Sequence, residues 1–299
     1  MLSARSVFRF APSPNGFLHL GHAFSALFTH AMAARHGGRF LLRIEDIDRE
    51  RSRPDYEAAI LDDLAWLGLD WERPVRRQSE HFDLYSEAIG KLTALGLIYP
   101  CFATRRDIAQ AFEARGAAAP RDPEGVPVYP GLYRDLSHEE SAARIAAGEA
   151  YALRLDMGKA AALAREIHGG PLTYRSFDAR GAEAATRADP ERWGDIVLAR
   201  KDVPASYHIA VVTDDALQGV THVTRGLDLI AATDIHRLLQ VLLGLPEPLY
   251  WHHRLIVDNS GRKLSKSHRD KSLRSLRAED VTPEAVKELV GFSGEKWLE

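Results

Sequence analysis

The chain has 299 residues, 45% of them hydrophobic, and a formal net charge of −3, which suits an ordinary globular protein with a sizeable core. No uncharged apolar run of about 18 residues is present to span a bilayer, and the N-terminus lacks the apolar stretch of a signal peptide. We therefore expect a cytoplasmic protein. The single cysteine, Cys101, excludes an internal disulfide and a cysteine-rich zinc site. The charge excludes a global attraction to nucleic acid.

The first hundred residues alternate between strand and helix patterns. Residues 6–11 (SVFRFA) predict a buried strand, and apolar residues follow at helical spacing between 24 and 32. Residues 38–48 predict a second strand, and residues 53–68 predict a helix with Pro54 near its start. This order predicts an α/β fold with a parallel sheet, which binds ligands at the carboxyl ends of its strands.

The second part of the chain loses this pattern and then regains it. Residues 101–200 are rich in Ala, Gly, Pro and charge without a clear period, which predicts an inserted subdomain with mobile loops. The β-branched residues of 205–226 predict strands, and 228–246 predict a helix with Leu238, Leu239 and Leu242 on one face. The predicted units are the two halves of one domain at 1–100 and 201–267, the insert at 101–200 and a short tail at 268–299.

A turn between the first strand and helix, APSPNGFLHLGH at 11–22, has the composition of an anion site. A helix N-terminus offers backbone N–H groups and partial positive charge, and glycines let phosphate oxygens come close. His19 and His22 could donate hydrogen bonds to those oxygens and to charge that develops on phosphorus. Taken alone, two such histidines are more often plain surface or core residues. A zinc site is less favoured, since no third ligand is near.

A second segment, DNSGRKLSKSHRDKSLRSLR at 258–277, is strongly basic and interrupted by Gly and Ser. Taken alone it would be a solvated loop. Together with the His-containing turn, it favours a lysine-bearing loop that closes over a polyphosphate.

The two segments resemble, in order and spacing, the two signature motifs of class I aminoacyl-tRNA synthetases. The matching stretches are HLGH at 19–22 and KLSKS at 263–267. This resemblance implies a Rossmann-like parallel-sheet catalytic domain with an inserted α+β subdomain and a short helical tail. It implies ATP with Mg²⁺ as substrate, and His19, His22, Lys263 and Lys266 as catalytic residues. The implied ATP-binding residues are Pro12, Gly16, His19, Gly21, His22, Lys263, Leu264, Ser265, Lys266 and Ser267.

Residues 9–22, 41–51 and 206–226 resemble the glutamate branch of that family. The amino-acid pocket implied by this resemblance is formed by Arg9, Ala11, Ser13, Glu45, Tyr207 and Arg225. Two arginines and one glutamate match the two carboxylates and one ammonium of L-glutamate. Which arginine takes which carboxylate stays open. An alternative for Glu45, with Asp46 and Asp48 beside it, is an acidic strand end that binds magnesium or only water.

Only residues 268–299 follow the lysine motif, whereas an anticodon-binding domain needs on the order of 100 residues. Leu227 also stands where full glutamyl-tRNA synthetases usually carry an acidic residue. The chain thus resembles the truncated branch, the glutamyl-queuosine tRNA(Asp) synthetases. This resemblance implies a monomer that activates L-glutamate without RNA and transfers it to the queuosine base of tRNA(Asp). Two alternatives are a minimal synthetase that charges tRNA(Glu) and a non-catalytic protein that binds ATP or glutamate.

The truncated branch commonly carries zinc on a Cys-x-Cys pair and a later Tyr-x-x-x-Cys. This chain has Cys101 with Ala103, and Tyr129 with Tyr133. One thiolate and two phenols do not make a tetrahedral zinc site, so we predict none, with Cys101 a small buried residue. Packing should then hold the insert together, through Tyr99, Phe102, Tyr129 and Tyr133.

Overall fold

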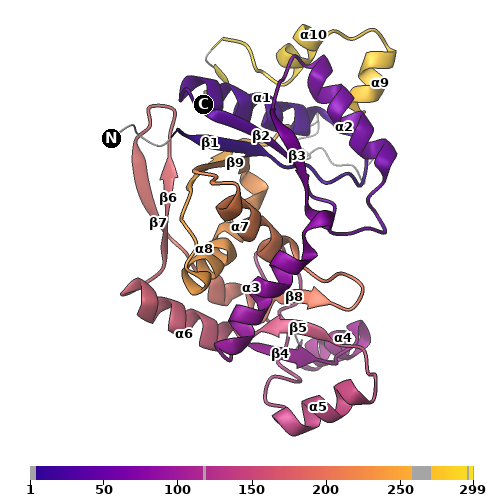
Figure 1. Cartoon of the computed structure of the whole chain (residues 1–299), viewed down its shortest axis with the longest axis vertical. Helices are drawn as coiled ribbons and strands as arrows, with labels where there is room; N and C mark the ends of the chain where they lie inside the picture. The colour runs from indigo at the N-terminus through magenta and orange to yellow at the C-terminus, as the bar shows by residue number, and fades with distance from the viewer. Residues whose placement is uncertain (1–4, 117–118, 258–270, 295, 299) are drawn as a thin grey trace.

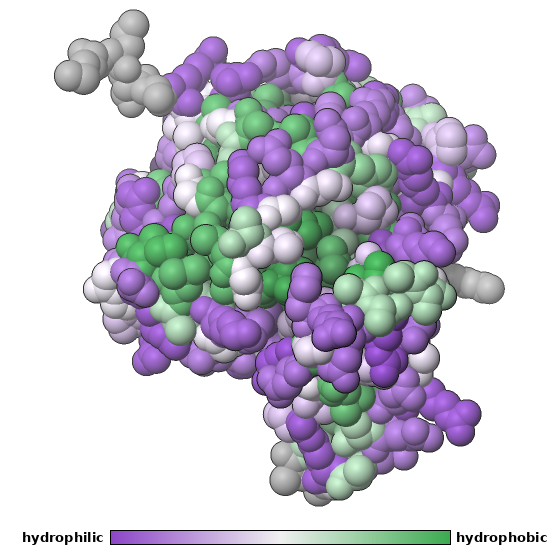
Figure 2. Space-filling view, turned by 60° about the horizontal axis from the view of Figure 1, so that its bottom comes forward, coloured by the Kyte–Doolittle hydropathy of each residue, from purple (hydrophilic) through white to green (hydrophobic). Residues whose placement is uncertain are grey.

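The computed structural model describes residues 5–116, 119–257, 271–294 and 296–298. Within these residues the chain forms two sheets: a larger one in the body of the molecule and a smaller one in a lobe that projects from it (Figures 1 and 2). No helix in the described part of the chain is both long and apolar enough to cross a bilayer.

The larger sheet carries the predicted α/β fold. Its seven strands are, in spatial order, β3 (Glu72–Arg77), β2 (Arg39–Ile44), β1 (Val7–Phe10), β9 (His222–Gly226), β10 (Leu249–His253), β6 (Thr173–Phe177) and β7 (Glu183–Arg187). Neighbouring strands are parallel, except that β6 and β7 form an antiparallel hairpin. The strands predicted within 6–11 and 38–48 are β1 and β2, so the predicted parallel sheet is confirmed.

Helices cover both faces of this sheet, which is why all four residues of β1 are buried. Val7 packs into one core, whereas Phe8 and Phe10 pack into the other. The helices on the Phe8 side are α1 (Leu20–Arg35), α2 (Pro54–Trp66), α9 (Leu273–Ala278) and α10 (Pro283–Leu289). Those on the Val7 side are α3 (Phe82–Ala94), α6 (Met157–His168), α7 (Tyr207–Leu217) and α8 (Ala232–Leu243) (Figure 1).

The prediction for 205–226 was partly wrong. Only β9 in this segment is a strand, and Tyr207–Leu217 form α7. Residues 209–215 of α7 are all buried, between the sheet, α3 and α8. A short run that is buried throughout has no periodicity to separate helix from strand, and packing overrides the β preference of its Ile and Val residues.

The smaller sheet joins β4 (Ile98–Cys101), β5 (Ala152–Leu155) and β8 (Val197–Arg200) in antiparallel order. Its lobe also carries α4 (Arg105–Ala114) and α5 (His138–Ala146) (Figure 1). Between β5 and β8 the chain leaves this sheet, because β6 and β7 lie in the larger one. The boundaries at 101 and 200 stay predictions.

The aromatic packing predicted for the insert is confirmed. Tyr99, Cys101 and Tyr129 are buried together, and the rings of Phe102 and Tyr133 lie 5.7 Å apart, edge to face. The Cys101 thiol donates to the Tyr129 hydroxyl (3.2 Å), which also accepts the backbone N–H of Tyr133 (3.1 Å).

The same group does not fit a zinc ion. Burial, and then the hydrogen bond from Cys101, raise the pKa of Tyr129, so its phenol resists becoming a ligand anion. Among the described residues, no three His, Cys, Asp or Glu side chains are grouped to hold a metal. That the protein works without zinc stays a prediction.

Candidate active site

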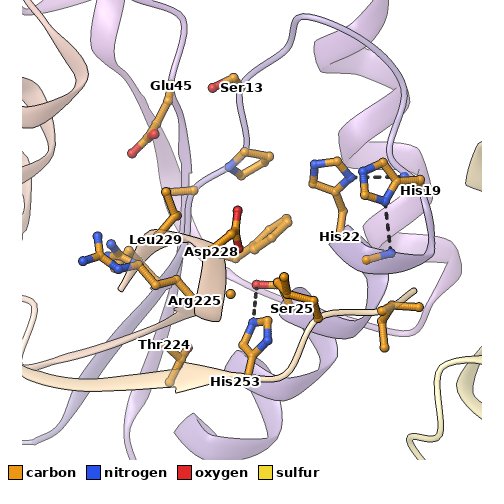
Figure 3. Close-up of a pocket in the computed structure, with 18 of the residues that line it drawn as sticks. Ser13, His19, His22, Ser25, Glu45, Thr224, Arg225, Asp228, Leu229 and His253 are labelled. Atoms are coloured by element: carbon orange, nitrogen blue, oxygen red, sulfur yellow. Dashed lines mark hydrogen bonds between the residues drawn. The ribbon is translucent and has the colours of Figure 1, made fainter. Parts of the chain in front are cut away.

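A cavity of about 750 Å³ lies at the carboxyl ends of β1, β9 and β10, beside the N-terminus of α1. This is the edge of a parallel sheet where ligands are expected. Figure 3 shows Glu45 and Arg225 on one side of the cavity and His19 and His22 on the other.

Most of the predicted site residues meet in this cavity. They are Arg9, Ala11, Pro12, Ser13, His19, Gly21, His22, Glu45, Tyr207 and Arg225. Gly16 is not among the lining residues. The predicted Lys263, Leu264, Ser265, Lys266 and Ser267 lie outside the described residues. Residues on either side of that segment reach the site, since Leu255 and Ile256 line the cavity and Ser272 pairs with His19 in a β-bridge.

His19 and His22 cap the N-terminus of α1. The Nδ1 atom of His19 accepts the backbone N–H of Gly21 (3.1 Å), and Nδ1 of His22 accepts the backbone N–H of His19 (3.2 Å). This is a reciprocal capping box in which two imidazoles replace the usual hydroxyl and carboxylate. Because each Nδ1 is an acceptor, the proton of each neutral ring is on Nε2. The cap therefore fixes two N–H donors at the positive end of the helix.

Gly21 is required between the two histidines for a steric reason. A Cβ at position 21 would lie 2.9 Å from Cε1 of His19, closer than real Cβ contacts, and 3.1 Å from its Nδ1, which is tight. A larger residue would therefore displace the His19 ring from its capping position.

At the other end of the cavity, a buried network links three elements of the sheet side. Arg9 on β1 donates to Asp215 on α7 (3.0 Å), and Arg43 on β2 donates to the same carboxylate (2.7 Å) and to Glu45 (3.1 Å). Asp214 on the same helix pairs with Arg76 (2.8 Å) and also with Arg43 (3.8 Å). Helix α7 thus fixes the position of Arg9 at the cavity wall.

The two acids of this network differ in their pKa shifts. Burial would raise the pKa of Asp215, but Arg9 and Arg43 together lower it below its usual value. Burial dominates at Glu45 and raises its pKa despite Arg43 and Arg9. Of the two carboxylates, Glu45 is therefore the one whose ionised form a further nearby cation would stabilise more.

The acidic cluster considered for magnesium does not converge in the structure. Glu45 pairs with Arg43, Asp48 pairs with Arg51 (2.6 Å), and Asp46 accepts two hydrogen bonds from Ser79. The pairing of Glu45 with Arg43 favours a place for Glu45 in the amino-acid pocket over a magnesium site.

Arg225 differs from Arg9 in having only neutral partners among the described residues. Its guanidinium donates to the Thr233 hydroxyl (2.7 Å), to Nδ1 of His236 (3.0 Å) and to Nε2 of His252 (3.3 Å). Its Nη1 also lies 3.4 Å from the Tyr207 hydroxyl. Arg225 is 5% exposed, so a full positive charge is buried at the cavity without a carboxylate beside it in the described structure.

Sequence reasoning missed several residues of the site. Further lining residues are Asn15, Ser25, Thr224, Asp228, Leu229, His253 and Arg254, and the supporting residues are Arg43 and Asp215. The paired acids at 214–215 were a signal, because two acids in an otherwise apolar stretch need buried partners.

This fold and site define a class I tRNA synthetase, a ligase. Residues 6–296 match the family of class I tRNA synthetases (E and Q), catalytic domain, and the chain belongs to this family. Among its relatives, a glutamyl-Q tRNA(Asp) synthetase of Rhodobacter capsulatus is 49% identical, over 95% of this chain and 99% of the relative. Another, of Symbiobacterium thermophilum, is 41% identical over 93% and 83%. The resemblance to this truncated branch is thus confirmed.

A solved glutamate-tRNA synthetase of Elizabethkingia anophelis has the same fold. It superimposes with a TM-score of 0.70 at 30% sequence identity, and the match covers 90% of this chain. The chain spans about half the length of that synthetase, 54% of which is covered.

Proposed function

We propose that the protein activates L-glutamate with ATP and Mg²⁺ to form glutamyl-adenylate, and then transfers the glutamyl group to the queuosine base of tRNA(Asp). The finer specificity is supported by the similarity to two relatives named glutamyl-Q tRNA(Asp) synthetase. The chemistry is supported by the residues at the two ends of the cavity.

The observation that carries the proposal is Arg225, a buried guanidinium whose described partners are all neutral. A buried charge is costly unless it is paired, so a carboxylate of the substrate is its natural counter-ion. In the neighbouring network Arg9, Arg43 and Arg76 balance Glu45, Asp214 and Asp215, so Arg225 adds one positive charge. L-Glutamate carries one net negative charge, and its ammonium would supply a second cation for Glu45 beside Arg43.

The opposite end suits the phosphates of ATP. The capped N-terminus of α1 places the His19 and His22 rings and the positive end of the helix dipole at this end of the cavity. The substrate α-carboxylate is ionised and attacks the α-phosphorus without a general base, forming the acyl phosphate bond as pyrophosphate leaves. Alignment and charge stabilisation then supply the catalysis, with His19, His22, Lys263 and Lys266 as the proposed contacts in the transition state.

A second cavity of about 340 Å³ offers a path for the accepting nucleoside. It shares Ser13, Glu45 and Tyr207 with the first cavity and extends to Ala199 and Arg200 at the end of β8. In our proposal a hydroxyl of the modified base enters here and attacks the glutamyl carbonyl carbon. AMP leaves with the bonding electrons, and the hydroxyl proton passes to solvent.

The test is glutamate-dependent ATP-pyrophosphate exchange without RNA, followed by transfer of labelled glutamate. The acceptors are tRNA(Asp) with queuosine, tRNA(Asp) without it, and tRNA(Glu). Exchange with transfer only to the queuosine-containing tRNA is the expected result. Transfer to tRNA(Glu) would make the protein a charging enzyme, and absence of exchange would overturn the catalytic role.

A further inference from the structure

The partners of Arg225 form a chain of side chains that extends behind the cavity. His236 and Thr233 come from α8, and His252 from β10. His208, on α7, lies beyond His236, with its Nδ1 atom 3.3 Å from Nε2 of His236. None of these three histidines lines the cavity.

Arg225 determines which nitrogen of each ring carries the proton. A guanidinium has no acceptor, so Nδ1 of His236 must accept from Arg225, and the His236 proton is on Nε2. Nε2 of His236 then donates to Nδ1 of His208, whose own proton is also on Nε2. Nε2 of His252 also accepts from Arg225 (3.3 Å) and so carries no proton; the Thr233 hydroxyl, which accepts from Arg225, therefore donates to it (3.0 Å), and His252 is protonated on Nδ1.

We propose that His236, backed by His208, is a positioning residue for glutamate recognition. It orients the Arg225 guanidinium toward the substrate carboxylate by a neutral hydrogen bond, so that the full charge of Arg225 remains for the substrate. The inference rests on the proposed function, since it assumes that Arg225 binds a carboxylate of glutamate.

The contrast with Arg9 gives the physical reason. Asp215 holds Arg9 with a charged hydrogen bond and offsets part of its charge. A carboxylate at position 236 would do the same to Arg225 and would compete with the substrate. A neutral acceptor also restricts the rotamers of the arginine, which reduces the entropy lost when the substrate binds. It does so without competing with the substrate carboxylate.

The surroundings keep these rings neutral. The titratable and charged groups that face His236 are Arg225 on β9, Tyr207 and His208 on α7, His252 on β10 and Arg9 on β1. Burial, followed by the charge of Arg225, lowers the pKa of His236 well below its usual value, and lowers that of His252 to about 3. Among the described residues that face His236, none is a carboxylate that would favour the imidazolium form.

The experiment compares His236→Asn with His236→Asp, because the Oδ1 atom of either can replace Nδ1 as acceptor while only the aspartate adds charge. KM for glutamate, KM for ATP and kcat are measured by pyrophosphate exchange. His236→Asn should keep the glutamate KM within about threefold. His236→Asp should raise it by about tenfold or more while the ATP KM stays constant. Equal glutamate KM values for the two variants would overturn the inference.

A second readout does not depend on catalysis. Long-range ¹H–¹⁵N spectra of the histidine rings should show His236 and His208 protonated on Nε2 and His252 on Nδ1, all neutral at pH 6.5. A doubly protonated or Nδ1-protonated His236 would contradict the inference. If wild-type protein shows these tautomers but no glutamate-dependent exchange, the proposed function fails and the inference about substrate binding fails with it. If exchange is present and the two variants bind glutamate equally, only the inference fails.

Discussion

Replacing Gly21 by alanine should separate stability from catalysis. The new Cβ would lie 2.9 Å from Cε1 of His19. That atom is at the end of a rotatable side chain, so the ring should move rather than the backbone. The lost cap costs about 1 kcal/mol, and the better helix propensity of alanine offsets up to about 1 kcal/mol. We therefore expect a free energy of unfolding within about 1 kcal/mol of wild type.

Catalysis should respond far more strongly, because the displaced ring no longer aims its Nε2–H at the phosphates. Loss of one such donor lowers kcat by about 10² to 10³-fold, with little change in the glutamate KM. The assay is pyrophosphate exchange beside urea unfolding. Gly90→Ala in α3 is the matched control: nothing lies within 4 Å of its Cβ, so it should gain about 0.5–1 kcal/mol and keep full activity. Wild-type exchange by Gly21→Ala would refute the reasoning.

Four further predictions concern Arg225, Asp215, Lys266 and zinc. Arg225→Gln should raise the glutamate KM by about tenfold to a hundredfold, while the exposed Arg165→Gln changes neither KM nor kcat. Asp215→Asn should lower the free energy of unfolding by about 3–5 kcal/mol in urea. The pKa of Asp215 is lower in the folded protein than its unfolded value of 3.8. Its contribution to the free energy of unfolding is therefore present above pH 3.8 and is lost as the pH falls through the lower folded pKa. The variant should accordingly lose less stability on acidification than wild type. Lys266→Ala should lower kcat by orders of magnitude at nearly constant glutamate KM; an unchanged rate would remove the lysine segment from the mechanism. Treatment with a zinc chelator should leave Tm and exchange unchanged, and a fall in either would show that metal contributes.

The elements that the sequence predicted well are those with a clear hydrophobic period or with Pro or Gly at their ends. Strand β1 and helix α2, with Pro54 at its first turn, follow directly from local pattern. The error at α7 has a physical origin in its complete burial. It also hid the role of Asp214 and Asp215: in a strand, neighbouring side chains point to opposite faces, whereas in α7 both acids face arginines of the sheet.

The site was predictable where the residues are close together in sequence and less so elsewhere. The turn at 11–22 showed its histidines, but the pairing of Arg9 with Asp215 joins positions 206 residues apart. The partners of Arg225 on α8 and β10 likewise depend on packing between elements. The spacing of these residues along the chain does not predict their contact with Arg225, because the contact depends on how the whole fold packs.

The hairpin of β6 and β7 has a practical consequence for protein engineering. These strands extend the larger sheet next to β10, although the chain enters and leaves them from the smaller one. Excising residues 101–200 as a module would remove both strands and leave β10 as an unprotected sheet edge, which invites intermolecular pairing and aggregation. A deletion or transplant of the lobe should therefore keep residues 173–187 in the body, with the new chain junctions placed before and after this hairpin.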